Sequence, residues 1–189
     1  MESGKIEPTV LVVDDERKVA DAYTLRLQDR YSVETAYGGE EALELIDSET
    51  DVVLLDRRMP GLSGDEVLRT VRDRRVDCRV IILTAVDPGF DILDMPFNDY
   101  LCKPVDRENL FDAIDQQLRV IAYELLTEYF ELASKRAVLR AELPEAKLQD
   151  SEQYRTVEDR KQEFERRLRG LVDDYEEIKK AFDSINRES

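Results

Sequence analysis

The sequence predicts an α/β protein with a doubly wound, five-stranded parallel sheet, followed by long helices that form a hairpin or a coiled coil. Short apolar runs alternate with helical patterns over about the first 118 residues, which is typical of βαβ units. Polar residues able to carry chemistry come directly after several of these runs. From about residue 119 onward, apolar residues recur at steps of three and four, which indicates helices.

Five segments are predicted as strands: residues 9–13, Ser32–Ala36, 51–55, Arg79–Thr84 and Asp99–Cys102. Helices are expected between them, over about Glu16–Asp29, from Gly39 through Ile46 and around Val67–Val71, with a short one within Pro88–Met95. The clearest strand contains Val52–Leu55, whose four apolar residues end abruptly at Asp56. An apolar run of this kind is typical of a buried parallel strand.

Charged or hydroxyl groups end four of the five predicted strands. Asp14 and Asp15 follow the first, Asp56 the third, Thr84 ends the fourth and Lys103 follows the fifth. Because the carboxyl ends of parallel strands meet at one edge, we expect one pocket with three carboxylates, a hydroxyl and an ammonium.

Three clustered carboxylates repel one another unless a cation lies among them, and an all-oxygen site suits Mg²⁺. One carboxylate can then act as a nucleophile toward a phosphoryl group, whose oxygens the lysine and the hydroxyl would neutralise and hydrogen-bond. Judged only from its place at the end of a strand, Asp56 could also be a metal ligand or a helix N-cap. The N-cap is disfavoured because Pro60 and Gly61 come before the next helical pattern.

The composition is acidic and poor in lysine. The formal net charge is −16, and the basic residues are 8 Lys and 20 Arg. Residues 1–118 hold 14 basic and 27 acidic residues, a net charge of −13, whereas residues 119–189 have a net charge of −3. This composition indicates a halophilic source, because the salt of such a cytosol screens repulsion between surface charges strongly. An ordinary acidic protein from a mesophile is the alternative.

Several functions are excluded by residues that the sequence lacks. Without histidine, the chain is neither a phosphohistidine carrier nor a Ser-His-Asp hydrolase, and no glycine-rich phosphate loop is present. Its two cysteines give no disulfide framework. No signal peptide and no apolar run long enough for a membrane span are present, so we expect a cytoplasmic protein without a membrane partner.

Residues at the ends of the predicted strands also match the motifs of a known family. Asp14-Asp15, Asp56 with Met59-Pro60-Gly61, Thr84-Ala85 and Lys103-Pro104 resemble the receiver domain of two-component response regulators, over about residues 8–118. The resemblance implies a flavodoxin-like receiver that accepts a phosphoryl group on Asp56 from a sensor histidine kinase.

The same resemblance implies further residue roles. Asp14 or Asp15, or both, would bind Mg²⁺ together with Asp56 and the backbone carbonyl of Arg58. Thr84 and Lys103 would contact the phosphoryl group. Thr84 and Tyr100 would form the switch, although Tyr100 could equally be an ordinary strand aromatic. The interval from Thr84 to Lys103 is a few residues shorter than is usual, which puts the usual receiver dimer in doubt.

The last receiver helix is expected to continue into the appendage, from about residue 107 to 142, so that domains of residues 1–118 and 119–189 share it. A polar turn over Leu143–Asp150 should precede a second helix from about Ser151 to Asn186. The second helix carries a heptad seam. An antiparallel hairpin and a parallel intermolecular coiled coil both remain open.

The segment 95–105, Leu132-Ala133-Ser134-Lys135 and the final heptad helix resemble haloarchaeal response regulators with a HalX domain. The expected function is non-enzymatic: phosphorylation-controlled signalling through a helical interaction domain, with a homodimer through the C-terminal helices as one partner arrangement. The alternative is a DNA-binding transcription regulator, which the net charge of the tail does not support. A phosphohydrolase is disfavoured because Arg58 stands where such enzymes have a second aspartate.

Overall fold

The protein is described from a computed structural model, which covers residues 7–172, 175–177 and 179–180. Contacts within the chain separate a unit of Glu7–Leu118 from a second unit that begins at Arg119. Among the described residues, none of the helices combines the length and the apolar character needed to cross a lipid bilayer.

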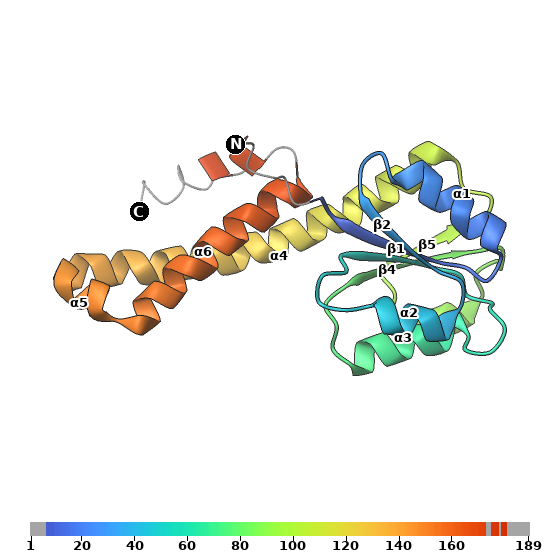
Figure 1. Ribbon diagram of the computed structural model, residues 1–189, viewed down its shortest axis with the longest axis horizontal. Helices are drawn as coiled ribbons and strands as arrows, with labels where there is room; N and C mark the ends of the chain where they lie inside the picture. Colours follow the sequence, from blue (N-terminus) through green and yellow to red (C-terminus); the bar gives the residue numbers. More distant parts are fainter. Residues whose placement is uncertain (1–6, 173–174, 178, 181–189) are drawn as a thin grey trace. The chain divides into compact units, whose positions relative to one another are not determined.

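The first unit is built on a five-stranded parallel sheet (Figure 1). Its strands are β1 (Thr9–Val13), β2 (Ser32–Ala36), β3 (Val52–Leu55), β4 (Arg79–Thr84) and β5 (Asp99–Cys102). They lie side by side in the order β2-β1-β3-β4-β5, and every neighbouring pair is parallel. The predicted doubly wound sheet is therefore confirmed, and β1, β3 and β4 form its buried centre.

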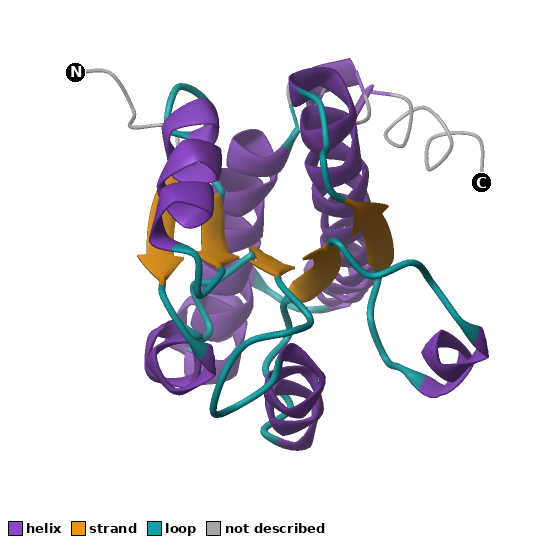
Figure 2. Cartoon of the chain, turned by 90° about the vertical axis from the view of Figure 1, so that its right-hand side faces the viewer, coloured by secondary structure: helices purple, strands orange, loops and turns teal. Residues whose placement is uncertain are grey.

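Helices cover both faces of this sheet, as Figure 2 shows. The segments after each strand form α1 (Arg17–Leu27), α2 (Gly39–Leu45), α3 (Gly64–Asp73), the 3₁₀ helix η1 (Phe90–Asp94) and the start of α4 (Arg107–Glu142). Apolar residues of α2 and α3 pack on one face, where Val67, Leu68 and Val71 join Val53 and Ile82 in a buried cluster. Burial of this apolar surface is the main favourable contribution to folding.

The first residues of α4 are fixed to the unit by polar and aromatic contacts. The rings of Tyr31 and Phe111 stack with 5.7 Å between their centroids. The hydroxyl of Tyr31 donates to Asp115 Oδ1 at 2.7 Å, and Arg30 lies 3.0 Å from the same carboxylate. These contacts hold Leu110 and Ile114 in the core, where both are fully buried.

The short fourth helix is a single stretch of 3₁₀ helix, η1, five residues long. Pro88, Gly89 and Pro96 bracket it closely, which leaves no room for a longer α-helix. Its Phe90 and Leu93 side chains are largely exposed. The short helix expected within Pro88–Met95 is therefore present as this 3₁₀ helix.

The second unit is helical and contains the rest of α4, then α5 (Glu145–Asp150) and α6 (Glu152–Leu171). Tyr129 of α4 donates to Glu165 of α6 at 2.9 Å, and Arg136 of α4 lies 2.6 Å from Glu158 of α6. A step of seven residues forward on α4 thus corresponds to seven backward on α6. The two helices are antiparallel, as in the predicted hairpin (Figure 1).

Two predictions about this unit are wrong in detail. The segment Leu143–Asp150 is not only a turn, because α5 begins at Glu145 after Pro144, whose fixed φ suits a helix start. The next helix, capped by Ser151 as expected, ends at Leu171 rather than near Asn186. Val172 is extended, two residues after Gly170, which weakens helix propensity, and residues 175–177 and 179–180 are helical again. The predicted seam positions Ile178, Phe182 and Ile185, together with Asn186, lie outside the described residues.

Candidate functional site

The carboxyl ends of β1 and β3 bring three aspartates together. Asp14 and Asp15 follow β1, and Asp56 follows β3, which is hydrogen-bonded directly to β1. One carboxylate oxygen from each residue lies within 4.8 Å of the others. Asp14 is 2% exposed and Asp56 is 9% exposed, so water screens their charges poorly. This all-oxygen donor set, at this spacing, fits a small divalent cation.

Lys103 contributes the positive charge of the site from the loop after β5. Its Nζ lies 2.5 Å from Asp14 Oδ2 and 3.2 Å from Asp56 Oδ2. Burial by itself would lower the pKa of Lys103, but the hydrogen bond to Asp14 and the charges of Asp56 and Asp14 outweigh it and raise that pKa. The lysine is therefore an ammonium that offsets part of the carboxylate repulsion.

Backbone amides hold the aspartate side chains in place. Asp56 Oδ1 accepts from the amide of Arg57 at 2.7 Å and from that of Arg58 at 3.5 Å. Asp14 Oδ1 accepts from the amide of Glu16 at 2.9 Å. Asp56 Oδ2 faces Lys103, so the two oxygens of Asp56 have different surroundings. Arg58 lies in the loop that starts at Asp56, where its amide is the second of these donors.

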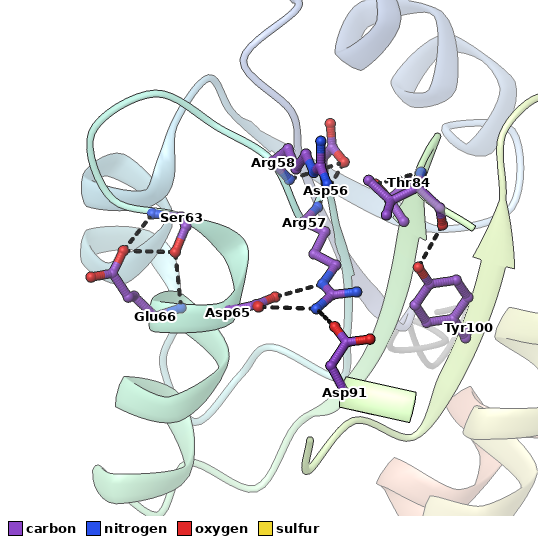
Figure 3. A network of polar contacts seen from close by, with 10 residues as sticks. Asp56, Arg57, Arg58, Ser63, Asp65, Glu66, Thr84, Asp91 and Tyr100 are labelled. Carbon is purple, nitrogen blue, oxygen red and sulfur yellow. Dashed lines mark hydrogen bonds and ion pairs between the residues drawn. The ribbon is translucent and has the colours of Figure 1, made fainter. Parts of the chain in front are cut away.

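Thr84 and Tyr100 are connected through the segment that follows β4. Thr84 is almost fully buried, and its Oγ1 accepts from the amide of Val86 at 3.4 Å. The hydroxyl of Tyr100 donates to the carbonyl of the same Val86 at 2.7 Å (Figure 3). The two residues predicted as the switch thus bind one short segment of backbone.

Arg57 is a site residue that sequence reasoning missed. Its guanidinium makes two hydrogen bonds to Asp65 of α3, at 3.0 and 3.3 Å, and one to Asp91 of η1 (Figure 3). The hydrogen bonds to Asp65 and to Asp91 raise the pKa of Arg57, which is largely buried. The arginine ties the loop after Asp56 to two other elements. No local pattern signals ion pairs that are 8 and 34 residues apart.

The start of α3 packs directly against the loop that carries Asp56. Ser63 caps the helix in a reciprocal capping box with Glu66. The amide of Gly64 donates to the carbonyl of Arg57 at 3.1 Å. A Cβ atom at Gly64 would lie 2.1 Å from the Asp56 carbonyl oxygen, so only glycine allows this approach.

Replacing Gly64 with alanine should therefore lower the free energy of unfolding by about 1–3 kcal/mol, the usual cost of overpacking. Gly38→Ala is the matched control, because a Cβ atom there would meet nothing within 4 Å and the backbone is extended, with φ 170. Urea denaturation measures both variants. Equal losses would show that the approach of α3 to Asp56 is not tightly constrained.

Comparison with known proteins gives two family matches. The profile of the response regulator receiver domain matches residues 10–115, and the profile of the HalX domain matches residues 119–185. A curated protein from Haloferax volcanii, described as "Putative transcriptional regulator", is 48% identical over 140 residues. The alignment covers 73% of this chain but only 24% of that protein, so the chain spans about a quarter of its relative's length. The haloarchaeal relative agrees with the acidic, lysine-poor composition.

Solved structures resemble the first unit. A signal receiver domain from Vibrio parahaemolyticus is 27% identical with a TM-score of 0.60, over 65% of this chain and 98% of that chain. The response regulator TrrA from Thermotoga maritima, solved in complex with Mg(2+)-BeF, is 31% identical with a TM-score of 0.53, over 58% of this chain and 98% of that chain. A Francisella receiver domain is 32% identical with a TM-score of 0.55, over 59% and 96%.

Proposed function

Because this chain belongs to the response regulators of two-component systems and carries a receiver domain followed by a HalX domain, we propose that Asp56 is its phosphoacceptor. The observation that carries the proposal is the convergence of Asp14, Asp15 and Lys103 on Asp56 at one edge of the sheet. A sensor histidine kinase is the proposed phosphodonor. We take residues 1–118 as the receiver and 119–189 as the output domain.

In the proposed reaction, a carboxylate oxygen of Asp56 attacks the phosphorus atom of the donor. A phosphorus–oxygen bond forms while the bond from phosphorus to the histidine nitrogen breaks, and its electron pair stays on that nitrogen. Lys103 can transfer its hydrogen bond from Asp56 to a phosphoryl oxygen, and the Thr84 hydroxyl can donate to another. Preorganised positive charge and donors of this kind stabilise the transferring group.

Asp14, Asp15, Asp56 and the backbone carbonyl of Arg58 are the proposed ligands of Mg²⁺. The bound ion would neutralise charge on the carboxylates and on the incoming phosphoryl oxygens. The carboxylate cluster supports this proposal, because among the described residues Lys103 is the one cation that forms ion pairs with it, against three carboxylates. The crystallised relative with Mg(2+)-BeF gives independent support from the same family.

The proposed switch starts at Thr84. When its hydroxyl turns toward the phosphoryl group, the contact with the Val86 amide is lost, and the segment held by Tyr100 through the Val86 carbonyl is free to rearrange. The tyrosine would then move with that segment. In this proposal, the first conformational consequence of phosphorylation lies between β4 and η1.

The proposed output is protein association through the helical unit, including a homodimer, in a cytoplasmic protein that does not act as an enzyme on external substrates. Receiver domains of this family are signalling modules, which supports that proposal. DNA-binding regulation of transcription is the second candidate, favoured by the description of the Haloferax relative. The net charge of −3 over residues 119–189 favours the first, because nucleic-acid binding usually needs a basic surface.

Incubation of the full chain with acetyl phosphate and Mg²⁺ tests the phosphoacceptor. Intact-mass measurement should detect one phosphoryl adduct, stable in acid and labile in base, that disappears with a chelator or in Asp56→Asn. Asp51→Asn is the matched control, since Asp51 is also buried but lies at the other end of β3, where it accepts from the Thr9 amide. An undiminished adduct in Asp56→Asn would overturn the assignment.

A further inference from the structure

The 3₁₀ helix η1 has one polar side-chain contact with another element of the receiver unit. Asp91 makes it, and its partner is Arg57, in the loop after the phosphoacceptor. None of the five residues of η1 is buried, and Phe90 and Leu93 are 92% and 77% exposed. Because so little apolar surface is removed from water, burial contributes little to holding η1 in place. The position of this helix therefore depends strongly on the ion pair.

The two partners of the ion pair differ in how firmly they are held. The guanidinium of Arg57 is largely buried and also donates to both carboxylate oxygens of Asp65, at 3.0 and 3.3 Å. This fork geometry fixes its orientation. The start of α3, which carries Asp65, is itself fixed by the close approach at Gly64. Asp91 is about half exposed and belongs to η1. When the pair separates, Asp91 should be the partner that moves.

An open cavity of about 490 Å³ lies beside the ion pair, between the loop that follows Asp56 and the segment from Val86 to Asp91. Arg57 and Asp91 both line it, so the pair connects the two walls of an unfilled space. Gly89 leaves room for the carboxylate, since a Cβ atom there would lie 2.7 Å from Asp91 Oδ1. The segment thus has space to move once the ion pair no longer holds it.

The other end of this segment is bound by the two residues of the proposed switch. The amide of Val86 donates to Thr84 Oγ1, and its carbonyl accepts from the Tyr100 hydroxyl (Figure 3). When Thr84 turns toward the phosphoryl group, the Val86 end is released while the Asp91 end is still held by Arg57. A shift of about 1 Å at Asp91 takes its carboxylate beyond hydrogen-bonding distance of the anchored guanidinium. Movement of the whole segment therefore requires the ion pair to open.

We propose that the Arg57–Asp91 ion pair is a latch, which holds the segment from Val86 to Asp91 in its unphosphorylated position and opens when Asp56 is phosphorylated. This inference rests on the proposed phosphoacceptor and switch, and it adds the pair that sets how readily the switch turns. A contact made in only one of two conformations stabilises that conformation. Removing the latch should therefore favour the switched conformation, and a ligand that needs this conformation should bind more tightly.

Beryllofluoride with Mg²⁺ is the probe for the switched conformation, because it takes the place of a phosphoryl group on the acceptor carboxylate. Asp91→Asn in the full chain keeps the size of the side chain and removes its charge. The affinity for beryllofluoride, measured by fluorine NMR, should rise about two- to fivefold, the effect expected of a half-exposed ion pair. Asp94→Asn is the matched control, since Asp94 is an exposed aspartate of the same helix, and its affinity should not change.

A double-variant cycle shows whether the effect comes from the ion pair. In Arg57→Met protein, which has no guanidinium at this position, Asp91→Asn should change the affinity by less than about 1.5-fold. High KCl should also reduce the difference between Asp91→Asn and the original protein, because salt screens a half-exposed pair. The latch is overturned by an unchanged affinity in Asp91→Asn, by an equal rise in Asp94→Asn, or by an undiminished effect in the Arg57→Met background.

Hydrogen exchange of the metal-free protein tests the hold on the segment without any phosphorylation. Peptides that cover residues 85–91 should exchange faster in Asp91→Asn than in the original protein or in Asp94→Asn. Equal exchange in the three proteins would contradict the latch. The Asp56 adduct from acetyl phosphate is measured on the same samples. An original protein that forms no adduct and binds no beryllofluoride would overturn the phosphoacceptor, and the exchange rates alone would then decide whether the ion pair holds the segment.

Discussion

Replacing both Asp14 and Asp15 with alanine is expected to lower the affinity for Mg²⁺ by at least about 100-fold. Loss of an outer-shell partner alone typically costs 10–100-fold in metal affinity, and this change removes two of the three clustered carboxylates. Phosphorylation by acetyl phosphate should fall with it. Titration calorimetry measures the affinity, and the mass adduct measures the phosphorylation.

The control for this variant changes the net charge equally at a distant place. Asp73→Ala with Asp77→Ala removes two exposed carboxylates near the end of α3 and before β4. Mg²⁺ affinity should stay within about threefold of the original there. The proposed metal site is wrong if the two double variants lose affinity equally.

The structure also changes what is expected of the metal-free protein. Carboxylate repulsion alone would make removal of Asp14 and Asp15 neutral or stabilising. Asp14, however, accepts from the Glu16 amide and lies 2.5 Å from Lys103. Loss of both buried contacts should make the metal-free variant less stable than the original protein.

Lys103→Met is expected to have the second large effect. Methionine keeps the unbranched apolar stem but leaves Asp14 and Asp56 without their ammonium, so the metal-free protein should lose about 1–3 kcal/mol of stability, somewhat below the usual cost of breaking a buried pair. Phosphorylation should slow at least tenfold. Mg²⁺ should restore more stability to this variant than to the original protein, because the ion replaces the missing positive charge.

The pH dependence of this variant follows from the raised pKa of Lys103. A group whose pKa is higher in the folded than in the unfolded state contributes its full stabilisation of the fold below the unfolded-state pKa, which is near 10.5 for lysine. That contribution is lost as the pH rises through the folded-state pKa. The stability difference between the original protein and Lys103→Met should thus be constant near neutral pH and shrink in strong alkali. Lys18→Met, at an exposed lysine of α1, should have no such difference. A gap that stays open above the folded pKa would mean that Lys103 acts by packing.

The strands and the acidic edge could be predicted because local sequence determines them. Val52–Leu55 is wholly apolar and Asp56 follows it, so five residues predict both the buried strand and the carboxylate at its carboxyl end. The same holds for Thr84 and for Lys103, whose places depend only on where β4 and β5 end.

The structural features that the sequence did not reveal depend on residues far apart in the chain or on competing local effects. Arg57 joins Asp65 and Asp91, and the sequence around it gives no sign of either partner. Helix α6 ends at Leu171, next to Gly170, whereas the heptad pattern predicts an unbroken helix; residues 175–177 and 179–180 are helical again, so the pattern misses only the interruption at Val172 among the described residues.

Asp56, and no other aspartate of the cluster, is proposed to carry the phosphoryl group. Borohydride reduction of the phosphorylated chain converts an aspartyl phosphate to homoserine, which peptide mass spectrometry can locate. Homoserine is expected at position 56 alone, dependent on Mg²⁺ and absent in Asp56→Asn. Homoserine at position 14 or 15, or a phosphorylated chain that yields none, would contradict it.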